Sequence, residues 1–422
     1  MLYARRGRLP KGVKSPQPKA DRKGQSQTVQ TLRAQHPLKY LLHIANLPKS
    51  SFYYHHQDRP DPDAADKALL VLSFGGPEKP EDVRPFLENV TRGRGIPASR
   101  LDEVAVHYHH FDGYSPLNDC NREIIANVEA ELRRRGSTLP VYFGNRNWHP
   151  YANDIALELA ENGHRNVAVF ATSAWGGYSG CRQYGEDIQK MRHHLAEHHK
   201  TPIDFYRLRQ FFDHPTFIEA GAHAIRNAYQ QYADQGIGRD DIRLIFTAHS
   251  IPVVADQRSG TDADGALYSR QVHETARLIA GRLGVADYDV VWQSASGDGK
   301  VPWLEPDILD HAHLLHQRGE THLLVAPIGF ISDHMEVIWD LDNELQDEAR
   351  NLGMTVIRAA TVGHTTEFAA LIVDLIDESL GITPPRHVGA IVSKGCIKNG
   401  EPCETSCCRP ARPTRLLHTA TA

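Results

Sequence analysis

From Lys67 onward, short runs of apolar and β-branched residues alternate with segments that have the period of an amphipathic helix. The first run, ALLVLSF at 68–74, is broken by GGP and followed by the helical pattern EDVRPFLENV. Six further runs predict strands: PVYF at 140–143, NVAVFAT at 166–172, DIRLIFTA at 241–248, DVVWQS at 289–294, THLLVAPI at 321–328 and MTVIRAA at 354–360. Strands that alternate with helices are typical of a parallel α/β fold.

The predicted strands form two groups, near 68–172 and 241–360, which indicates two doubly wound halves. We expect these halves to span 67–238 and 239–385, followed by a Cys-rich tail at 386–422. Ligands of doubly wound folds bind at the carboxyl ends of the strands. Functional residues are therefore expected in the loops that directly follow strands.

Residues 1–66 differ from the rest of the chain, because basic residues separated by Pro, Gly, Ser and Gln predominate at their start. Such a segment cannot bury a core, so we expect a largely disordered extension. The segment 32–67, which begins inside this extension, resembles the segment just upstream of the catalytic domain in IS3-type transposases. It is either a residual DNA-binding arm or a remnant of a gene fusion or of a misassigned start.

Composition narrows the class of protein. The 422 residues are 41% hydrophobic and 23% charged, as in an ordinary globular protein of two or three domains. No run of 18 apolar residues predicts a membrane span, and the basic N-terminus lacks the apolar segment of a secretory signal. The net charge of -5 argues against a nucleic-acid binder, so no functional nucleic acid is expected. We expect a cytosolic monomer.

The segments that follow two of the predicted strands contain candidate catalytic or metal-binding residues. His249 comes directly after DIRLIFTA, where it is either a base active near neutral pH or a turn residue that hydrogen-bonds the backbone before Pro252. After THLLVAPI, the residues Glu336, Asp340 and Glu344 have the i, i+4, i+8 spacing of one helix face.

The three carboxylates have two readings. Like charges at this spacing cost about 0.2–0.5 kcal/mol per pair. A cap at Asp333 explains Glu336 in the first turn but not Asp340 or Glu344. The row is therefore either a solvated acidic face or a set of oxygen ligands for a divalent cation.

Four of the six cysteines lie in one short stretch of the tail, at Cys396, Cys403, Cys407 and Cys408. Their spacing lacks the paired CxxC motifs that favour structural zinc. A disulfide framework is not expected in the last tenth of a chain without a secretory signal. Thiolate ligation of a metal centre is the sharper interpretation; zinc and free reduced thiols stay open.

Nine motifs together resemble the ferrochelatases, specifically the actinobacterial type that is similar to the coproporphyrin III ferrochelatases. In chain order from about Leu69 to Leu380 they are LVLSFGGP, ENVTRGRGIP, HYHHFDGYSPLN, VYFGNRNWHPY, TSAWGGYSGCRQY, TAHSIP, WQSASG, WLEPD and GFISDHMEVIWDLD. The resemblance implies two Rossmann-like halves with a porphyrin cleft between them. It also implies insertion of ferrous iron into coproporphyrin III in heme biosynthesis. The alternatives are protoporphyrin IX as the substrate, or a related cobalt or nickel chelatase.

The resemblance also assigns residues. It makes His249 the active-site histidine, Glu336 the carboxylate opposite it in the metal site, and Asp340 and Glu344 the path of incoming iron. The residues implied to contact porphyrin or to lie in the cleft are Ser115, Tyr184, Arg92, His107, Tyr108 and Phe74. Three positions depart from the family pattern: Phe74 replaces a tyrosine that reaches the iron in Bacillus-type enzymes, and Arg146-Asn147 replaces a frequent Lys-His pair.

Many actinobacterial ferrochelatases are similar in carrying a [2Fe–2S] cluster on C-terminal cysteines, and four thiolates can hold one. With Cys181, which is close to Tyr184 in the sequence, five candidate ligands exist: Cys181, Cys396, Cys403, Cys407 and Cys408. One of them is therefore spare. Cys120 is expected to be an inert small hydrophobe.

Overall fold

The computed structural model describes residues 43–45, 65–93, 95–296, 300–391, 395 and 397–410. The strands, and the helices from α4 onward, belong to one compact unit made of Pro62–Ser379 and Thr383–Ala422. Nearly all of the 1–66 extension, with its transposase-like segment, lies outside the described residues, and so does Cys396. The predictions made for these parts stay predictions.

The first sheet contains four parallel strands, β1 (Lys67–Ser73), β2 (Val141–Asn145), β3 (Asn166–Ala171) and β4 (Asp204–Arg207), in the order β2-β1-β3-β4. The central strand β1 is wholly buried from Leu69 to Leu72. Helices cover both faces of a parallel sheet, so its strands carry continuous apolar runs rather than an alternation.

The second sheet repeats this topology with β5 (Arg243–His249), β6 (Asp289–Gln293), β7 (His322–Ala326) and β8 (Thr355–Arg358), in the order β6-β5-β7-β8. The prediction of an α/β fold with two doubly wound, Rossmann-like halves is confirmed. In each sheet the first strand has neighbours on both sides, so the chain reverses its direction of winding at β1 and at β5. Such switch points are where ligands bind.

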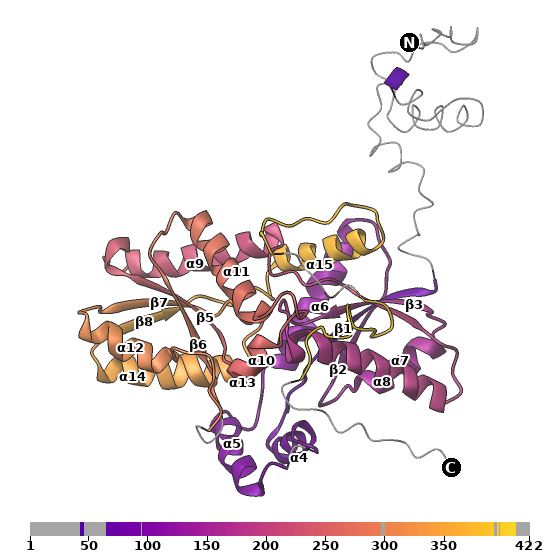
Figure 1. Cartoon of the computed structure of the whole chain (residues 1–422), viewed down its shortest axis with the longest axis horizontal. Coiled ribbons are helices and arrows are strands. Elements are labelled where there is room, and N and C mark those ends of the chain that lie inside the picture. The colour runs from indigo at the N-terminus through magenta and orange to yellow at the C-terminus, as the bar shows by residue number, and fades with distance from the viewer. Residues whose placement is uncertain are drawn as a thin grey trace. The chain divides into compact units, whose positions relative to one another are not determined.

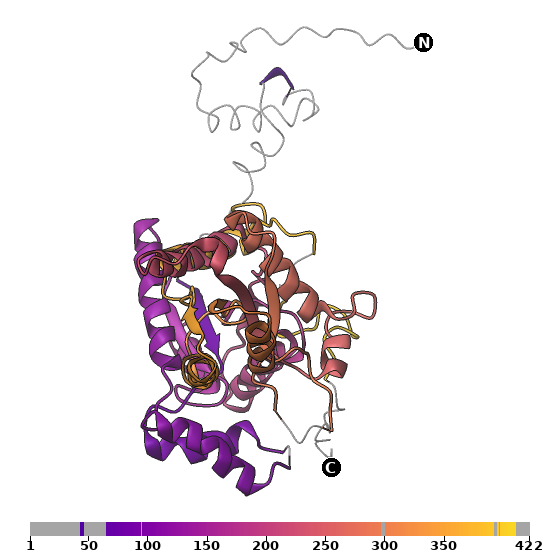
Figure 2. The same cartoon turned by 90° about the vertical axis from the view of Figure 1, so that its left-hand side faces the viewer.

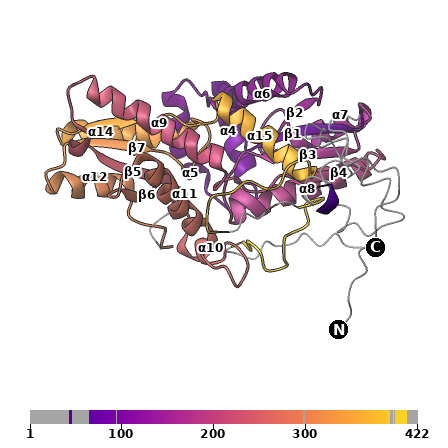
Figure 3. The ribbon, with the colours of Figure 1, turned by 90° about the horizontal axis from the view of Figure 1, so that it is seen from above.

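Helices separate the strands and cover the sheets. In Figure 1, α9 lies above the second sheet and α12 and α14 lie below it, and Figure 3 shows the two sheets side by side from above. The helices are α4 (Pro80–Val90), α5 (Ala98–His110), α6 (Leu117–Arg134), α7 (Ala152–Glu161), α8 (Gln183–Glu197), α9 (Pro215–Ala233), α10 (Val253–Gln257), α11 (Leu267–Leu283), α12 (Ile308–Gln317), α13 (Met335–Val337), α14 (Leu345–Asn351) and α15 (Thr366–Ser379), with π-helices η1 (Tyr178–Arg182) and η3 (Ile338–Glu344) and the 3-10 turn η2 (Arg239–Asp241).

Helices α4 and α5 form a separate pair with a small core of their own, in which Val83, Phe86, Leu87 and Leu101 are buried. Figures 1 and 2 show the pair below the two sheets. None of the described helices is both long and apolar enough to span a membrane.

Candidate active site and cysteine pocket

A cavity of about 430 Å³ opens at the carboxyl ends of β1, β2, β3 and β5, where the two halves meet. Six residues predicted for the site line it: Phe74, Tyr108, Ser115, Tyr184, His249 and Glu336. Four others, Arg92, His107, Asp340 and Glu344, are not part of its wall. The fold thus brings together residues from both halves of the sequence.

His249, the last residue of β5, faces Glu336 of α13, with its Nε2 atom 3.6 Å from the Oε1 atom of the carboxylate. The Nδ1 atom of the imidazole donates a hydrogen bond to the carbonyl oxygen of Ser250. The two readings of His249 left open by the sequence are therefore compatible. One ring nitrogen makes the backbone hydrogen bond, and the other is directed toward Glu336.

This pair is ionic. Partial removal from water by itself lowers the pKa of an imidazole and raises that of a carboxyl group. The attraction between the two groups outweighs this effect, so the pKa of His249 is raised to about 9 and that of Glu336 is lowered to about 2. At neutral pH the pair consists of an imidazolium and a carboxylate.

A second histidine, His334, also lines the cavity and was not among the predicted site residues. Its Nδ1 atom accepts a hydrogen bond of 3.2 Å from the backbone N–H of Glu336 and so caps α13. A nitrogen that accepts carries no proton, and burial lowers the pKa of His334, so this imidazole is neutral. The predicted cap, Asp333, is wrong: its carboxylate pairs with Arg358 at 3.0 Å. The signal in the sequence that could have identified His334 as the cap is that this polar residue stands directly before the first residue of the helix.

The spacing predicted that the acidic row lies on one regular α-helix, and this prediction is wrong. One turn of α13 leads into the π-helix η3, and the α-helix resumes only at α14. Such π-helical turns are frequent at functional sites. Of the row, Glu336 alone lines the cavity, while Glu344 is exposed.

Asp340 is linked to the cavity by polar neighbours at the end of β6. Its carboxylate accepts hydrogen bonds from the Nε2 atom of Gln293, at 3.3 Å, and from the hydroxyl of Ser294. Gln293 also donates to the carbonyl oxygen of Glu336 at 3.0 Å. Burial, and then repulsion by Glu336, raise the pKa of Asp340 to about 7. Because Asp340 is partly protonated at neutral pH, the row carries less charge than its sequence indicates.

The opposite wall comes from the first half of the chain. The guanidinium of Arg146 lies 4.6 Å from the ring of Tyr184 and 6.0 Å from that of Phe74. It pairs with Asp187 and donates a 2.9 Å hydrogen bond to Gln183. Arg146 is the one Arg or Lys among the described residues that line this cavity.

Two predicted cleft residues have other neighbours. The ring of His107 stacks on Trp339, with centroids 4.0 Å apart and planes 7° apart, and so joins α5 to η3. Arg92 is exposed just after α4. The motif resemblance placed His107 and Arg92 in segments of the cleft. The stacking of His107 on Trp339 could not be predicted, because the two residues lie far apart in the sequence.

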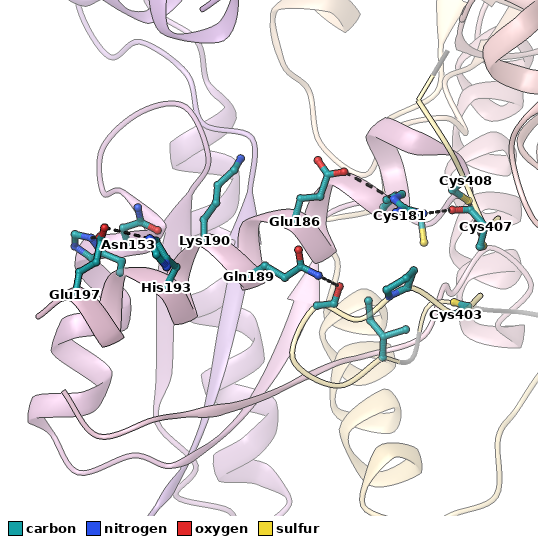
Figure 4. Close-up of a pocket in the computed structure, with 15 residues that line it drawn as sticks. Asn153, Cys181, Glu186, Gln189, Lys190, His193, Glu197, Cys403, Cys407 and Cys408 are labelled. Atoms are coloured by element: carbon teal, nitrogen blue, oxygen red, sulfur yellow. Dashed lines mark hydrogen bonds and ion pairs between the residues drawn. The ribbon is translucent and has the colours of Figure 1, made fainter. Parts of the chain in front are cut away.

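A second pocket, of about 780 Å³, lies along α8 and is lined by Cys181, Cys403, Cys407 and Cys408. Figure 4 shows the sulfur-bearing side chains at one end of it and His193 and Glu197 at the other. Cys181, Cys407 and Cys408 are buried together. The Sγ atom of Cys408 accepts hydrogen bonds from the backbone N–H groups of Gly177 (3.2 Å) and Gly260 (3.3 Å).

The thiols differ in their surroundings. The Sγ atom of Cys407 is 3.7 Å from that of Cys408. A hydrogen bond to Cys408, and burial, raise the pKa of the Cys181 thiol.

No group of three or more His, Cys, Asp or Glu side chains within the described ranges forms a ready metal site. Cys396 lies outside those ranges. The thiols of Cys181, Cys403, Cys407 and Cys408 nevertheless line one pocket. Cysteine thiolates gathered in this way are the ligands that an iron–sulfur centre takes.

Cys120 is half-buried on α6 and donates to the carbonyl oxygen of Asp333 at 3.5 Å. Burial, and then the Asp333 charge, raise the pKa of this thiol to about 11. It therefore stays protonated and unreactive, which agrees with the role expected for it.

The comparisons with known proteins agree with these features. A ferrochelatase family model matches residues 66–380. The protein named coproporphyrin III ferrochelatase in Corynebacterium diphtheriae is 60% identical over 351 residues, which is 82% of this chain and 95% of the relative. That of Nocardia farcinica is 57% identical over 350 residues, or 82% and 97% of the two chains.

Among solved structures, SirB from Bacillus subtilis with Fe3+ is 13% identical, covers 75% of this chain and 98% of its own, and has a TM-score of 0.45. This likeness is too weak to add to the assignment. The family match, by contrast, includes both sheets and the residues that face each other in the cavity. The chain belongs to the ferrochelatase family.

Proposed function

We propose that this protein inserts ferrous iron into coproporphyrin III, the substrate in the names of its relatives. The observation that supports this most directly is the pair His249 and Glu336, which face each other in a cavity between the two halves. Iron is the substrate of this reaction and not a resident cofactor. The product is iron coproporphyrin III, an intermediate of heme biosynthesis.

The reaction removes protons from pyrrole nitrogens and strips water from a hydrated cation. The Glu336 carboxylate neutralises the cation and replaces water ligands. The imidazole of His249 directs its Nε2 atom to the same space; because it is an imidazolium at neutral pH, this nitrogen must release its proton before it accepts one or binds the cation. His334 places a second imidazole beside Glu336. Asp340 and Glu344 continue from Glu336 along η3 and are proposed as the path of iron.

The wall from the first half suits a flat, anionic macrocycle. Phe74, Tyr108 and Tyr184 supply aromatic surface, and Ser115 supplies a hydroxyl. The charge of Arg146 is paired with Asp187. Its Nη2 atom, which lies in the wall between Phe74 and Tyr184, has no hydrogen-bond partner among the described residues and can donate to a propionate carboxylate. Coproporphyrin III carries more propionates than protoporphyrin IX, so a donor at this position favours it.

The test is iron insertion by the full chain under argon, with coproporphyrin III and protoporphyrin IX measured side by side. We expect a higher kcat/KM for coproporphyrin III. An equal or reversed preference would assign the protein to protoporphyrin IX. Faster insertion of Co2+ or Ni2+ than of Fe2+ would assign it to a related chelatase.

We propose further that Cys181, Cys396, Cys403 and Cys408 hold a [2Fe–2S] cluster and that Cys407 is the spare thiol. When bound, such a cluster exchanges single electrons. Two backbone N–H groups donate to Cys408 Sγ, and Arg207 donates to Cys181 Sγ at 3.0 Å. Hydrogen bonds of this kind stabilise thiolate ligands. No N–H donor to the Cys407 sulfur is found among the described residues.

The test is the visible spectrum and metal content of protein purified without oxygen. We expect a reddish protein whose visible absorption is lost in Cys403→Ser and Cys408→Ser and kept in Cys407→Ser. Loss of the colour in Cys407→Ser with retention in Cys408→Ser would reverse the ligand assignment. Colourless protein with stoichiometric zinc, or with no metal, would refute the cluster and leave the chelatase proposal untouched.

A further inference from the structure

A buried guanidinium lies between the cysteine pocket and the porphyrin cleft. Arg207, the last residue of β4, is 2% exposed. Its Nη1 atom donates to the carbonyl oxygen of Cys181 (2.9 Å) and to the Sγ atom (3.0 Å), and its Nη2 atom donates to the carbonyl oxygen of Gly180 (3.2 Å). The same cation lies 5.7 Å from the ring of Tyr184 in the cleft wall.

Arg207 has no carboxylate partner among the described residues, and its buried Nε atom has no hydrogen-bond partner there. Comparably buried arginines in this protein are compensated. Arg146 pairs with Asp187, and Arg209 pairs with Glu378 at 2.7 Å. A buried cation that lacks a counter-ion is strongly unfavourable. The fold therefore keeps at this position a charge that requires an anion.

Of the groups hydrogen-bonded to that charge, the one that can itself become negative is the sulfur of Cys181. A neutral thiol is a weak acceptor and compensates little, whereas a thiolate carries a full negative charge. A [2Fe–2S] centre with four thiolate ligands has a net negative charge, and reduction by one electron adds a further unit. Such a centre is the anionic group of the proposed function that would be bound by Cys181, whose sulfur accepts the hydrogen bond of Arg207.

We propose that Arg207 is the counter-ion of the thiolate-ligated centre at Cys181 and that it raises the reduction potential of that centre. The inference rests on the proposed cluster. A fixed positive charge stabilises the reduced form more than the oxidised form, because the reduced form is more negative. Removal of this charge makes the centre harder to reduce.

The test compares three variants of the full chain, purified without oxygen and titrated with dithionite while visible absorption and electron paramagnetic resonance are recorded. Arg207→Met removes the charge at similar length, and Arg207→Lys keeps it. Arg182→Met is the matched control, because Arg182 lines the same pocket and donates to Cys407 O at 2.9 Å but has Glu186 as a partner at 3.8 Å.

We expect Arg207→Met to lower the ratio of reduced to oxidised centre at least tenfold at the wild-type midpoint, which is about 59 mV for one electron. Arg207→Lys should recover most of this change, and Arg182→Met should stay close to wild type. An unchanged midpoint in Arg207→Met, or an equal shift in Arg182→Met, would overturn the proposal.

Loss of the centre is also informative. If Arg207→Met is colourless and Arg207→Lys is coloured, the charge is required and the proposal stands. If both are colourless but folded by circular dichroism, the shape of the guanidinium and not its charge is required, and the proposal falls. A colourless wild type would refute both the cluster and its counter-ion, whereas iron insertion measured on the same sample tests the chelatase separately.

Discussion

The two histidines beside Glu336 have different charges because their partners differ. His249 faces the carboxylate and is an imidazolium, and its pKa of about 9 follows from that attraction. His334 accepts a backbone N–H and is neutral. One carboxylate thus lies between a charged and an uncharged imidazole, which gives the proposed metal site a ligand that is already deprotonated, since the pKa of Glu336 is about 2.

His249→Ala is expected to abolish iron insertion and to leave porphyrin binding measurable. A positioned acid–base group contributes about 10²–10⁴-fold to rate, so a loss of that size or larger should appear in kcat. Porphyrin fluorescence quenching measures binding, and His223→Ala, at an exposed position of α9, is the control. Turnover within tenfold of wild type would remove His249 from the mechanism.

Glu336→Gln removes a charge at nearly constant shape and should be almost as damaging to turnover. It should also change the titration of His249. Without the carboxylate, burial is left as the main influence, so the pKa of His249 should fall from about 9 to below the ordinary value near 6.5. Nuclear magnetic resonance of the imidazole nitrogens across pH measures this shift. A pKa that stays near 9 would show that Glu336 is not its cause.

Among the elements, the π-helix η3 determines how Asp340 and Glu344 are oriented relative to Glu336. A π-helix has more residues per turn than an α-helix, so residues four apart are no longer aligned as in the predicted face. Asp340 is then drawn toward Gln293 and Ser294 at the end of β6, while Glu344 stays exposed. Ser294 has φ of 62°, a left-handed conformation that costs energy for a residue other than glycine, and in it the hydroxyl contacts Asp340.

Asp340→Asn and Glu344→Gln should mainly raise the apparent KM for iron and change kcat little. Both residues lie outside the cavity wall, so they affect delivery of the cation rather than the chemistry. We expect the larger effect, several-fold, from Asp340, since it is hydrogen-bonded through Gln293 to the segment of Glu336. Steady-state kinetics over a range of Fe2+ concentrations measures this. An unchanged iron dependence in both variants would make the row a merely solvated surface.

The edge of the second sheet has an ion pair that links β5 to β6. Arg243 donates to both oxygens of Asp289, at 2.6 and 2.7 Å. Burial by itself raises the pKa of Asp289, but Arg243 and then His311 outweigh it and hold this pKa well below its ordinary value. A depressed carboxyl pKa contributes stability above the unfolded value near 3.9, and this contribution is lost as the pH falls below it.

Asp289→Asn should therefore lower the free energy of unfolding at pH 7 by about 1.5–3 kcal/mol, the range for hydrogen bonds to charged groups. The difference from wild type should shrink below about pH 4, where the carboxyl group of the unfolded wild-type chain starts to bind protons while that of the folded protein is still ionised. Thermal unfolding across pH measures both effects. Destabilisation of equal size at pH 7 and at acid pH would show that charge is not the reason.

At the scale of the whole molecule, the compact unit begins at Pro62 and contains both sheets, the cavity and the cysteine pocket. Asp66 takes part in it, because its carbonyl oxygen accepts from the backbone N–H groups of Arg165 and Asn166. The cytosolic location, the monomeric state and the division at 238 and 385 stay predictions.

Deletion of residues 1–61 should leave iron insertion within about twofold of the full chain, because no described residue before Phe74 lines the cavity. The shortened chain keeps Asp66 and its hydrogen bonds. Kinetics and thermal unfolding of the two proteins check this. A folded but inactive truncation would contradict it, and a mobility shift of DNA by the full chain alone would restore the DNA-binding reading of the extension.

The amino-acid order alone identifies the strands that are buried on both faces, because such strands carry unbroken apolar runs wherever they lie in the chain. It also determined the family through motifs in register, and with it the roles implied for His249 and Glu336. The edge strand β4 was missed, since only Phe205 and Arg207 of its four residues are buried and no run results.

The protonation states of the site and the geometry of its helices became apparent only in the folded protein. The pKa of Asp340 near 7 and the stacking of His107 on Trp339 depend on segments that are distant in the sequence, and the π-helix interrupts a spacing that by itself predicts a regular helix face. Arg207 is the clearest case: an arginine in DFYR is ordinary in a sequence, and only its neighbours in space reveal that no carboxylate of the described residues pairs with it. Electrostatic energy depends on distance and burial in space, and the order of residues along the chain encodes neither directly.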